Sequence, residues 1–456
     1  MKIVNDRPII KLFTHKKNYF VYDTYTNSLL NISKEHYKEL CILLNKGVSE
    51  YVATEDNSTK QDILLLIKKG FFKAGFVNTI EHPLIPFVAQ LTDNCLHELV
   101  IQVTQDCNFN CRYCTFATEN GFDHTHNKKE MSWEIARKAI DYLYNHSSNA
   151  YEISIYFYGG EPLLNFTLIK KIVSYTQKIF KIKNVKYGMT INGSIMTDEM
   201  IDFFIEYDFH IAMSFDGNKD VQNKHRKFSS SGGGTFDVVS QNVEKIKSVN
   251  PLYFEQQISV MPVIFDDEDF EEVEKYFLDR GIKNITPLNV NLRGIDYKLQ
   301  VPINKKEGKI STFKSIEGIN SIFVDFEKYY NDKIEINSSW HHNGPCVAGV
   351  NRLFVDIYGR FFPCEKICEN KAALLGDVEN GINLSKVVEL LNIGRLSEKS
   401  CKNCWAMRFC NFCIDQCIDV ETGTLSSETK EIYCNLHKLK VLDFFKNKID
   451  QGDAYE

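Results

Sequence analysis

The sequence predicts an α/β protein with a parallel sheet at its centre and a different kind of unit on either side. Three observations carry this prediction. Strand-like and helix-like segments alternate between residues 95 and 295, a β-β-β-α-α order precedes them, and a cysteine-rich stretch follows them. Alternation of this kind is typical of βαβ units, and therefore of a doubly wound sheet or a complete or partial barrel. In both architectures the chemistry belongs at the carboxyl ends of the strands.

Residues 1–88 are expected to form a small separate unit. Three strand-like runs come first, at Ile9–Phe13, Tyr19–Tyr22 and Ser28–Ile32. Helical spacing of apolar residues follows at Lys34–Leu44 and Thr59–Lys69.

The central segment, residues 89–300, contains six expected strands and five expected helices. The strands are Leu99–Thr104, Ile153–Tyr158, Tyr187–Ile191, His210–Phe215, Gln257–Pro262 and Asn284–Val290. The helices are Trp133–Tyr144, Thr167–Phe180, Asp198–Tyr207, Phe236–Val249 and Asp267–Arg280. We expect residues 301–345 to be a bridge with a helix at Ile316–Tyr330, and residues 346–456 to be a third domain that opens with a hairpin at Leu353–Phe362.

Composition excludes several classes of protein. Of 456 residues, 43% are hydrophobic and 25% are charged, which is typical of a folded chain. The net charge of -6 disfavours nucleic acid as the main partner. Apolar runs such as Ile63–Ile67 are far too short to span a membrane, and Met1–Arg7 lacks the apolar region of a secretory signal. We therefore expect a cytoplasmic protein whose thiols stay reduced.

Twelve of the fourteen cysteines form two clusters, which suggests metal centres in two domains, while Cys41 and Cys95 stand alone. Cys107, Cys111 and Cys114 make a C-x3-C-x2-C run directly after the first strand of the central segment. Three thiolates on such a loop can hold one iron-sulfur cube and leave its fourth iron open. The alternatives are a three-cysteine zinc site or chance clustering. The second cluster comprises Cys346, Cys364, Cys368, Cys401, Cys404, Cys410, Cys413, Cys417 and Cys434.

The C-x3-C-x2-C run, with Tyr113 before its last cysteine, resembles the signature of the radical SAM enzymes. The resemblance implies a partial (β/α)6 barrel in which these cysteines hold a 4Fe-4S cluster. It also implies that the open iron chelates the amino and carboxylate groups of S-adenosyl-L-methionine. One electron would then cleave the cofactor to methionine and a 5'-deoxyadenosyl radical.

Residues at the ends of other expected strands also resemble those of this family. The resemblance assigns cofactor binding to Tyr113, Gly159, Gly160, Glu161, Pro162, Asn192, Ser214, Asp216 and Arg226. The two glycines would let the backbone approach the methionine part of the cofactor, Glu161 would bind its ammonium group, and Arg226 would meet its carboxylate. For each polar residue taken singly, a turn or a strand cap is the alternative.

The C-terminal cysteines resemble a SPASM domain, which carries two auxiliary 4Fe-4S clusters in enzymes that modify peptides or proteins. By this analogy Cys401, Cys404, Cys410 and Cys434 hold the outer cluster, and Cys346 and Cys364 with Cys413 or Cys417 hold the inner one. Cys368, His341, His342 or a substrate thiolate could complete the inner cluster. A zinc ribbon is the alternative. Glu365 beside Cys364 is a candidate catalytic base, with a surface salt bridge as the alternative.

The N-terminal unit resembles a RiPP recognition element, which pairs its third strand with the leader of a ribosomal precursor peptide. The edge to test is Ser28–Ile32 beside Lys34–Leu44. A winged helix that binds nucleic acid is the alternative, and the mixed charges of residues 1–88 weaken it.

Together these resemblances imply a radical SAM/SPASM maturase that forms thioether bonds in a cysteine-rich ribosomal peptide, with an electron donor such as flavodoxin or ferredoxin. Carbon-carbon cross-linking and formylglycine formation in sulfatases are the enzymatic alternatives. An iron-sulfur protein that only binds peptides is the non-enzymatic one.

Overall fold

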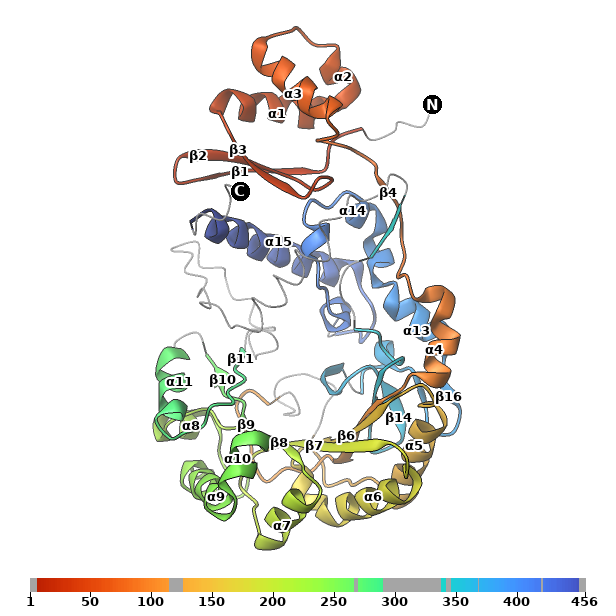
Figure 1. Cartoon of the computed structure of the whole chain (residues 1–456), viewed down its shortest axis with the longest axis vertical. Coiled ribbons are helices and arrows are strands. Elements are labelled where there is room, and N and C mark those ends of the chain that lie inside the picture. The colour runs from red at the N-terminus through yellow and green to blue at the C-terminus, as the bar shows by residue number, and fades with distance from the viewer. Residues whose placement is uncertain are drawn as a thin grey trace. The chain divides into compact units, whose positions relative to one another are not determined.

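The computed structural model describes residues 6–114, 126–265, 270–289, 338–341, 346–367, 369–419 and 421–450 (Figure 1). The chain divides into two compact units. The first unit consists of Met1–Pro86, Phe313–Cys346 and Val388–Glu456, and the second of Phe87–Thr312 and Val347–Val387. The stretch after residue 346 is thus shared between the units, and the four domain limits expected from the sequence stay predictions. The expected helix at Ile316–Tyr330 lies outside the described residues.

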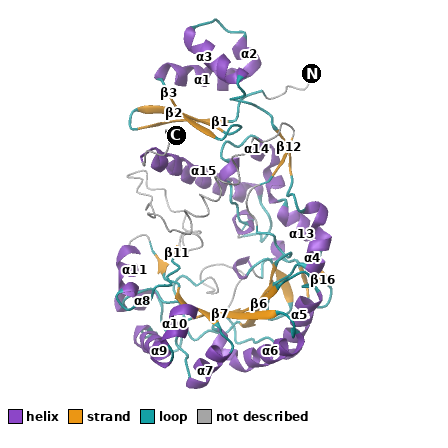
Figure 2. Cartoon of the chain, viewed as in Figure 1, coloured by secondary structure: helices purple, strands orange, loops and turns teal. Residues whose placement is uncertain are grey.

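A nine-stranded sheet forms the centre of the second unit (Figure 2). Its strand order is β16-β15-β14-β13-β5-β6-β7-β8-β9. Five neighbouring parallel strands are β5 (Glu98–Thr104), β6 (Glu152–Gly159), β7 (Asn184–Ile191), β8 (His210–Met213) and β9 (Ile258–Val260). The expected α/β class with a mostly parallel sheet is confirmed.

The hairpin expected at Leu353–Phe362 is present, and it extends this sheet. Its first strand, β13 (Arg352–Val355), pairs in parallel with β5, and its second is β14 (Arg360–Phe362). Two short antiparallel strands follow, β15 (Gly376–Asp377) and β16 (Gly381–Ile382).

The sixth expected strand, Asn284–Val290, is present in part among the described residues. In the region of Asn284–Val290, only β11 (Leu288–Asn289) is a strand, and it pairs with β10 (Val263–Ile264) in a separate two-stranded sheet. Ile285 makes a single parallel bridge to Val260 of β9. Backbone hydrogen bonds continue this parallel pairing: Val260 N–H donates to Asn284, Thr286 N–H to Val260 and Leu288 N–H to Pro262, each over 2.8 Å.

The five helices expected between the strands are present as α5 (Trp133–Asn145), α6 (Phe166–Ile179), α7 (Asp198–Glu206), α9 (Phe236–Val249) and α11 (Phe270–Leu278). Three seven-residue helices were not expected: α4 (Val88–Asn94), α8 (Lys219–His225) and α10 (Pro251–Gln257). Seven residues are two turns, which is too short for helical periodicity to stand out. A further helix, α13 (Leu384–Leu391), follows β16.

The first unit begins with the expected antiparallel strands β1 (Ile10–His15), β2 (Asn18–Asp23) and β3 (Ser28–Ile32), in the order β1-β2-β3. The helices α1 (Lys34–Lys46), α2 (Val48–Val52) and α3 (Ser58–Lys68) follow. Only α2 was not expected. The Ser33 side chain caps α1 by accepting a hydrogen bond from the His36 backbone.

The three-stranded sheet is buried on both faces. Val21 packs with Leu40 of α1 and Ile63 of α3. The side chains of its neighbours Phe20 and Tyr22 lie on the opposite face of the sheet, where they pack against the C-terminal part of the chain. The core residues there are Ala406, Phe409, Val441 and Phe445. The N-terminal strands therefore share a core with the C-terminal cysteine region inside the first unit, and the expected domain limit at residue 88 stays a prediction.

The last two of these core residues belong to α15 (Ser427–Asp450), a 24-residue helix that the sequence did not predict. The first unit also contains the parallel pair β4 (Val77–Ile80) and β12 (Ser338–Trp340), and the helix α14 (Glu398–Lys402). No helix in the described part of the chain is both long enough and apolar enough to cross a membrane.

Candidate functional site

The cysteine run follows β5 at the carboxyl edge of the parallel sheet. Backbone hydrogen bonds hold this loop against the segment that follows α8. Asn110 donates to Lys227 over 2.8 Å, and Arg112 donates to His225 over 2.9 Å. Burial raises the pKa of the Cys111 thiol to about 12, so the thiol stays protonated until a metal replaces the proton.

Two glycines at the end of β6 leave room for the backbone that leads into the cysteine loop. Gly159 has a φ of +155°, and a Cβ built on it would lie 2.2 Å from the carbonyl oxygen of Thr104. A Cβ on Gly160 would lie 2.3 Å from the carbonyl oxygen of Asp106. The glycines therefore permit a close approach to the protein's own backbone, next to Cys107, and their approach to the cofactor stays a prediction.

Glu161 is buried and connects the ends of two strands. One carboxylate oxygen accepts a hydrogen bond from the backbone of Leu163 over 3.0 Å, and the other accepts one from Asn192 over 2.7 Å. Burial raises its pKa to about 7, although both backbone donors act against this rise. Pro162 is the first residue of the short 3-10 helix Pro162–Asn165.

Asn192, at the end of β7, reaches the cysteine loop. Its side-chain amide donates to the Asn108 side chain over 2.8 Å and lies 3.9 Å from Cys107 Sγ. Asn108 in turn donates to Ser194 over 2.8 Å. Ser214 donates its backbone N–H to Ile191 over 2.8 Å, which joins the ends of β7 and β8.

Asp216, Tyr113 and Arg226 form a buried network beside Cys111. The Asp216 carboxylate accepts hydrogen bonds from the Tyr113 hydroxyl over 2.7 Å and from Arg226 Nε over 3.1 Å. The Arg226 guanidinium lies 5.3 Å from the centre of the Tyr113 ring, and its Nη1 lies 3.9 Å from Cys111 Sγ. Burial raises the pKa of Tyr113 well above its usual value.

The structure thus gathers the predicted residues of this edge around the cysteine loop. It also adds residues that the sequence did not single out: Asn108, Ser194, and Gln222, which accepts from the Asp216 backbone over 2.9 Å. Asn108 lies inside the cysteine run, which is the one signal that could have identified it. Three thiols on one loop with polar strand ends around them fit a 4Fe-4S cluster and a small charged cofactor.

No three His, Cys, Asp or Glu side chains of the described residues are grouped as ligands of a single metal ion. A cubane does not require such a group, because each of its thiolates binds a different iron.

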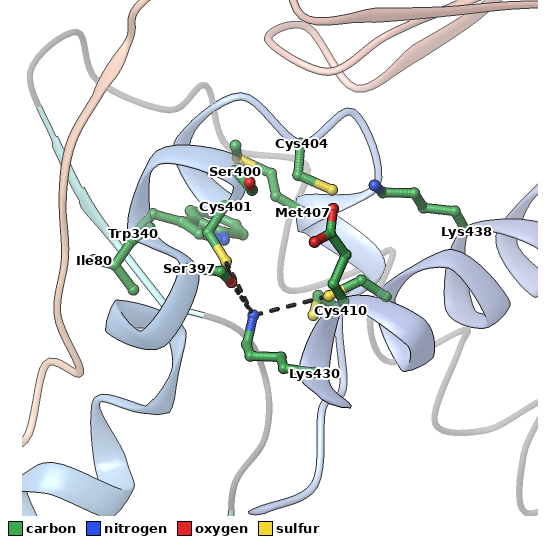
Figure 3. A pocket seen from close by; sticks show the side chains of 12 residues that line it. Ile80, Trp340, Ser397, Ser400, Cys401, Cys404, Met407, Cys410, Lys430 and Lys438 are labelled. Atoms are coloured by element: carbon green, nitrogen blue, oxygen red, sulfur yellow. Dashed lines mark hydrogen bonds between the residues drawn. The ribbon is translucent and has the colours of Figure 1, made fainter. Parts of the chain in front are cut away.

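A second set of cysteines surrounds a cavity of about 110 Å³ in the first unit (Figure 3). Cys401 lies on α14, Cys404 and Cys410 flank the 3-10 helix Met407–Phe409, and Cys434 lies on α15. All four line the cavity. Burial raises the pKa of Cys404 to about 11 and that of Cys410 further. The structure therefore brings together the four cysteines expected to hold the outer cluster.

The cysteines expected to hold the inner cluster divide between the two units, so that ligand set stays a prediction. Cys346, Cys413 and Cys417 belong to the first unit and Cys364 to the second. Cys417 is buried, whereas Cys413 is exposed. Cys368 and His342 lie outside the described residues. The ring of His341 lies against His82, with 4.7 Å between the ring centres.

Glu365 forms an ion pair. Its carboxylate lies 2.8 Å from Arg352 Nη2, and Arg352 Nε lies 2.6 Å from Glu98. The salt bridge considered for Glu365 is thus present, and it is mostly buried. A role as catalytic base stays a prediction.

Comparisons with known proteins agree with this geometry. Residues 101–279 match the radical SAM superfamily. Three relatives are similar to this chain over a larger part of its length. The uncharacterised protein MJ0907 of Methanocaldococcus jannaschii is 28% identical, over 65% of this chain and 94% of its own. The radical SAM cyclopropyl synthase TigE of Paramaledivibacter caminithermalis is 21% identical, over 91% and 89%. A cysteine-type anaerobic sulfatase-maturating enzyme of Clostridium perfringens is 22% identical, over 75% and 94%.

A solved structure shares the fold. Native anSMEcpe with bound AdoMet superposes with a TM-score of 0.54 at 20% identity, over 78% of this chain and 97% of that one. The matched segment 101–279 contains β6 to β9 and the cysteine loop, so the family match and the geometry of the site concern the same residues. Over residues 101–279, which hold the candidate site, the chain is similar to the radical SAM superfamily.

Proposed function

We propose that this protein is a radical SAM maturase that modifies a ribosomally made peptide. The observation that carries the proposal is that the first unit combines two structural features. There, a cavity lined by four cysteines belongs to the same compact unit as a three-stranded sheet whose β3 edge has no strand partner among the described residues. The sheet can hold a peptide and the cysteines can hold a redox centre.

The radical chemistry belongs to the second unit. Cys107, Cys111 and Cys114 would hold the 4Fe-4S cluster. S-adenosyl-L-methionine bound there supplies a 5'-deoxyadenosyl radical that removes a hydrogen atom from the substrate. The chain's own residues position these groups. The Asp216–Arg226 pair and Asn192 fix the polar surroundings of the thiols, and the glycines at the end of β6 fix the loop.

The leader peptide would dock on β3. In the described part of the chain this strand pairs with β2 on one side, and its other edge has no strand partner. An extended peptide can satisfy such an edge with main-chain hydrogen bonds, while the side chains of α1 next to it supply specificity.

The outer auxiliary cluster would occupy the cavity of the first unit, held by Cys401, Cys404, Cys410 and Cys434. It would accept the electron that the product radical releases. For a thioether, the substrate would lose a proton from its thiol, a hydrogen atom from its carbon and one electron, and a cluster held by these four cysteines would supply the acceptor for that electron. The S–C bond then forms without any other oxidant.

Thioether formation is the bond type that we favour from the cysteine pattern, and two relatives support other outcomes. The similarity to a cyclopropyl synthase over 91% of the chain favours carbon-carbon bond formation. The similarity to a sulfatase-maturating enzyme favours formylglycine formation.

Coexpression with short cysteine-rich reading frames found beside the gene tests the proposal, with mass spectrometry of the peptide before and after thiol alkylation. A thioether removes two hydrogen atoms and blocks one alkylation. A carbon-carbon link removes two hydrogen atoms and leaves every thiol reactive. Formylglycine replaces a cysteine thiol by an aldehyde. An unmodified peptide, combined with full cleavage of S-adenosyl-L-methionine, would refute the peptide assignment.

A further inference from the structure

A buried lysine stands among the four cysteines of the first unit. Lys430 lies on α15, one turn before Cys434, and is only 2% exposed. Its ammonium nitrogen lies 2.7 Å from Ser397 Oγ, 3.3 Å from Cys401 Sγ and 3.8 Å from Cys434 Sγ (Figure 3). It also lies 5.1 Å from the centre of the Phe412 ring.

These contacts leave the ammonium without a carboxylate. Among the described residues, Lys430 forms no ion pair with an aspartate or a glutamate. A buried charge is costly unless an opposite charge is near it. The neutral hydroxyl of Ser397 cannot supply that charge. Glu431 also lines this cavity, but no ion pair joins its carboxylate to Lys430 in the described part of the chain. The possible anions in contact with the ammonium are therefore the thiols of Cys401 and Cys434, which lose their protons when they bind iron.

We propose that Lys430 is the counter-charge of the outer auxiliary cluster and raises its reduction potential. This inference rests on the proposed cluster at Cys401, Cys404, Cys410 and Cys434. Four thiolates give a 4Fe-4S cluster a net negative charge, and reduction adds one more. A fixed ammonium within hydrogen-bonding distance of a ligand thiolate stabilises the reduced form more than the oxidised form. Lys430 is a positioning residue, since it touches the ligands rather than the substrate.

The proposal also explains the place of this lysine on its helix. A residue four positions before Cys434 shares its face of α15, so the ammonium and the thiol point into one cavity. A cluster that accepts an electron from a product radical needs a potential high enough to take it. An ammonium beside the thiolates shifts the potential in that direction.

The test compares Lys430→Met, which keeps an unbranched side chain one atom shorter and removes its charge, with Lys440→Met. Lys440 lies on the exposed side of the same helix. Both changes are made in the full-length chain with Cys107, Cys111 and Cys114 replaced by alanine, so that the radical SAM cluster does not contribute. The midpoint potential of the C-terminal clusters is then measured by redox titration followed by electron paramagnetic resonance, together with the iron content.

We expect Lys430→Met to keep its iron and to lower the potential of one cluster by at least 59 mV, which corresponds to a tenfold change in the ratio of reduced to oxidised cluster for a one-electron couple. Lys440→Met should leave the potential unchanged. Lys430→Arg, which keeps the charge, should return the potential most of the way to that of the parent protein. A potential in Lys430→Met equal to that of the parent would overturn the proposal.

If Lys430→Met loses iron, the iron content of Lys430→Arg shows whether the site needs the charge of lysine or its shape. Iron retained by Lys430→Arg but lost by Lys430→Met and Lys430→Gln supports a required charge. Iron lost by all three overturns the counter-charge role, because the site would then need the shape of lysine rather than its charge. Failure of the cluster proposal itself looks different. In that case Cys401→Ala and Cys404→Ala would have the same iron content as the parent.

Discussion

Replacing Gly160 by alanine tests how the cysteine loop is held in place. The new methyl group would lie 2.3 Å from the carbonyl oxygen of Asp106 and 2.6 Å from its carbon. Both atoms belong to the backbone, so no side-chain rotation can relieve the contact, and the segment from Gln105 to Cys107 must shift. Two hydrogen bonds depend on its position: Gly160 N–H to Thr104 over 3.1 Å, and Glu161 N–H to Asp106 over 2.8 Å.

The expected cost follows from these contacts. Each lost hydrogen bond destabilises by about 1 kcal/mol, and the overpacking adds about 1–3 kcal/mol. The free energy of unfolding of the second unit should therefore fall by about 3–5 kcal/mol, which corresponds to a melting temperature roughly 5–15 °C lower. The displaced loop should also bind less iron, because its thiols lose their arrangement.

Calorimetry of the cluster-free protein and iron analysis after anaerobic reconstitution measure the two effects. Gly233→Ala is the matched control. It lies on an exposed loop, where a Cβ would meet only the Ser231 hydroxyl at 3.2 Å. We expect that variant to behave as the wild type. If Gly160→Ala melts within about 2 °C of the wild type and binds the full amount of iron, the two glycines do not hold the loop and this reasoning is wrong.

Two other predictions concern buried charged groups. Arg408, which is 2% exposed, donates to the carbonyls of Thr24 over 2.7 Å and Tyr25 over 2.9 Å. Arg408→Ala should lower the free energy of unfolding of the first unit by about 2–6 kcal/mol, since each buried carbonyl left unpaired costs about 1–3 kcal/mol. Denaturant titration against Lys402→Ala, whose exposed ion pair contributes under about 1 kcal/mol, checks this, and equal stabilities would contradict it. Because burial raises the pKa of Glu161 from 4.5 to about 7, its contribution to stability is fully present below pH 4.5 and is lost as the pH rises through 7. The cluster-free protein should lose about 3 kcal/mol over that range, and Glu161→Gln should remove this pH dependence in urea titrations. An unchanged pH dependence in the variant would refute the role of this carboxyl group.

The sequence predicted the elements whose pattern is local. Residues 99–103 are buried on both faces of the parallel sheet, and all of them except Gln102 are apolar, which identified β5. The helix α15 shows the opposite case. Its buried residues Val441 and Phe445 coexist with exposed Ile432, Leu436 and Leu439, so apolar side chains surround the helix and no single face stands out. A periodicity argument cannot detect such a helix.

The candidate sites show the same contrast between residues marked by local sequence and residues that only the fold brings together. The spacing of Cys107, Cys111 and Cys114 identifies a cluster loop without any structure, because the three ligands are close in sequence. The partner of Gly160 is a carbonyl some fifty residues away, and nothing in the local sequence marks it. Lys430 is one lysine among many, and only the fold places its ammonium between two thiols.

The shared core of the first unit changes how the peptide-binding proposal should be tested. Thr24 donates to the carbonyl of Trp405 over 2.9 Å, and Arg408 holds the turn between β2 and β3. The strands proposed to bind the leader and the loop proposed to hold the outer cluster are therefore packed as one body. Deleting residues 1–88 would expose Phe409 and Phe445 and disturb the cysteines together with the leader site. Loss of activity in that truncation would not separate peptide binding from cluster assembly. A substitution of Asn31 does separate them, because Asn31 is the exposed residue of β3, whereas Leu29 packs against this core.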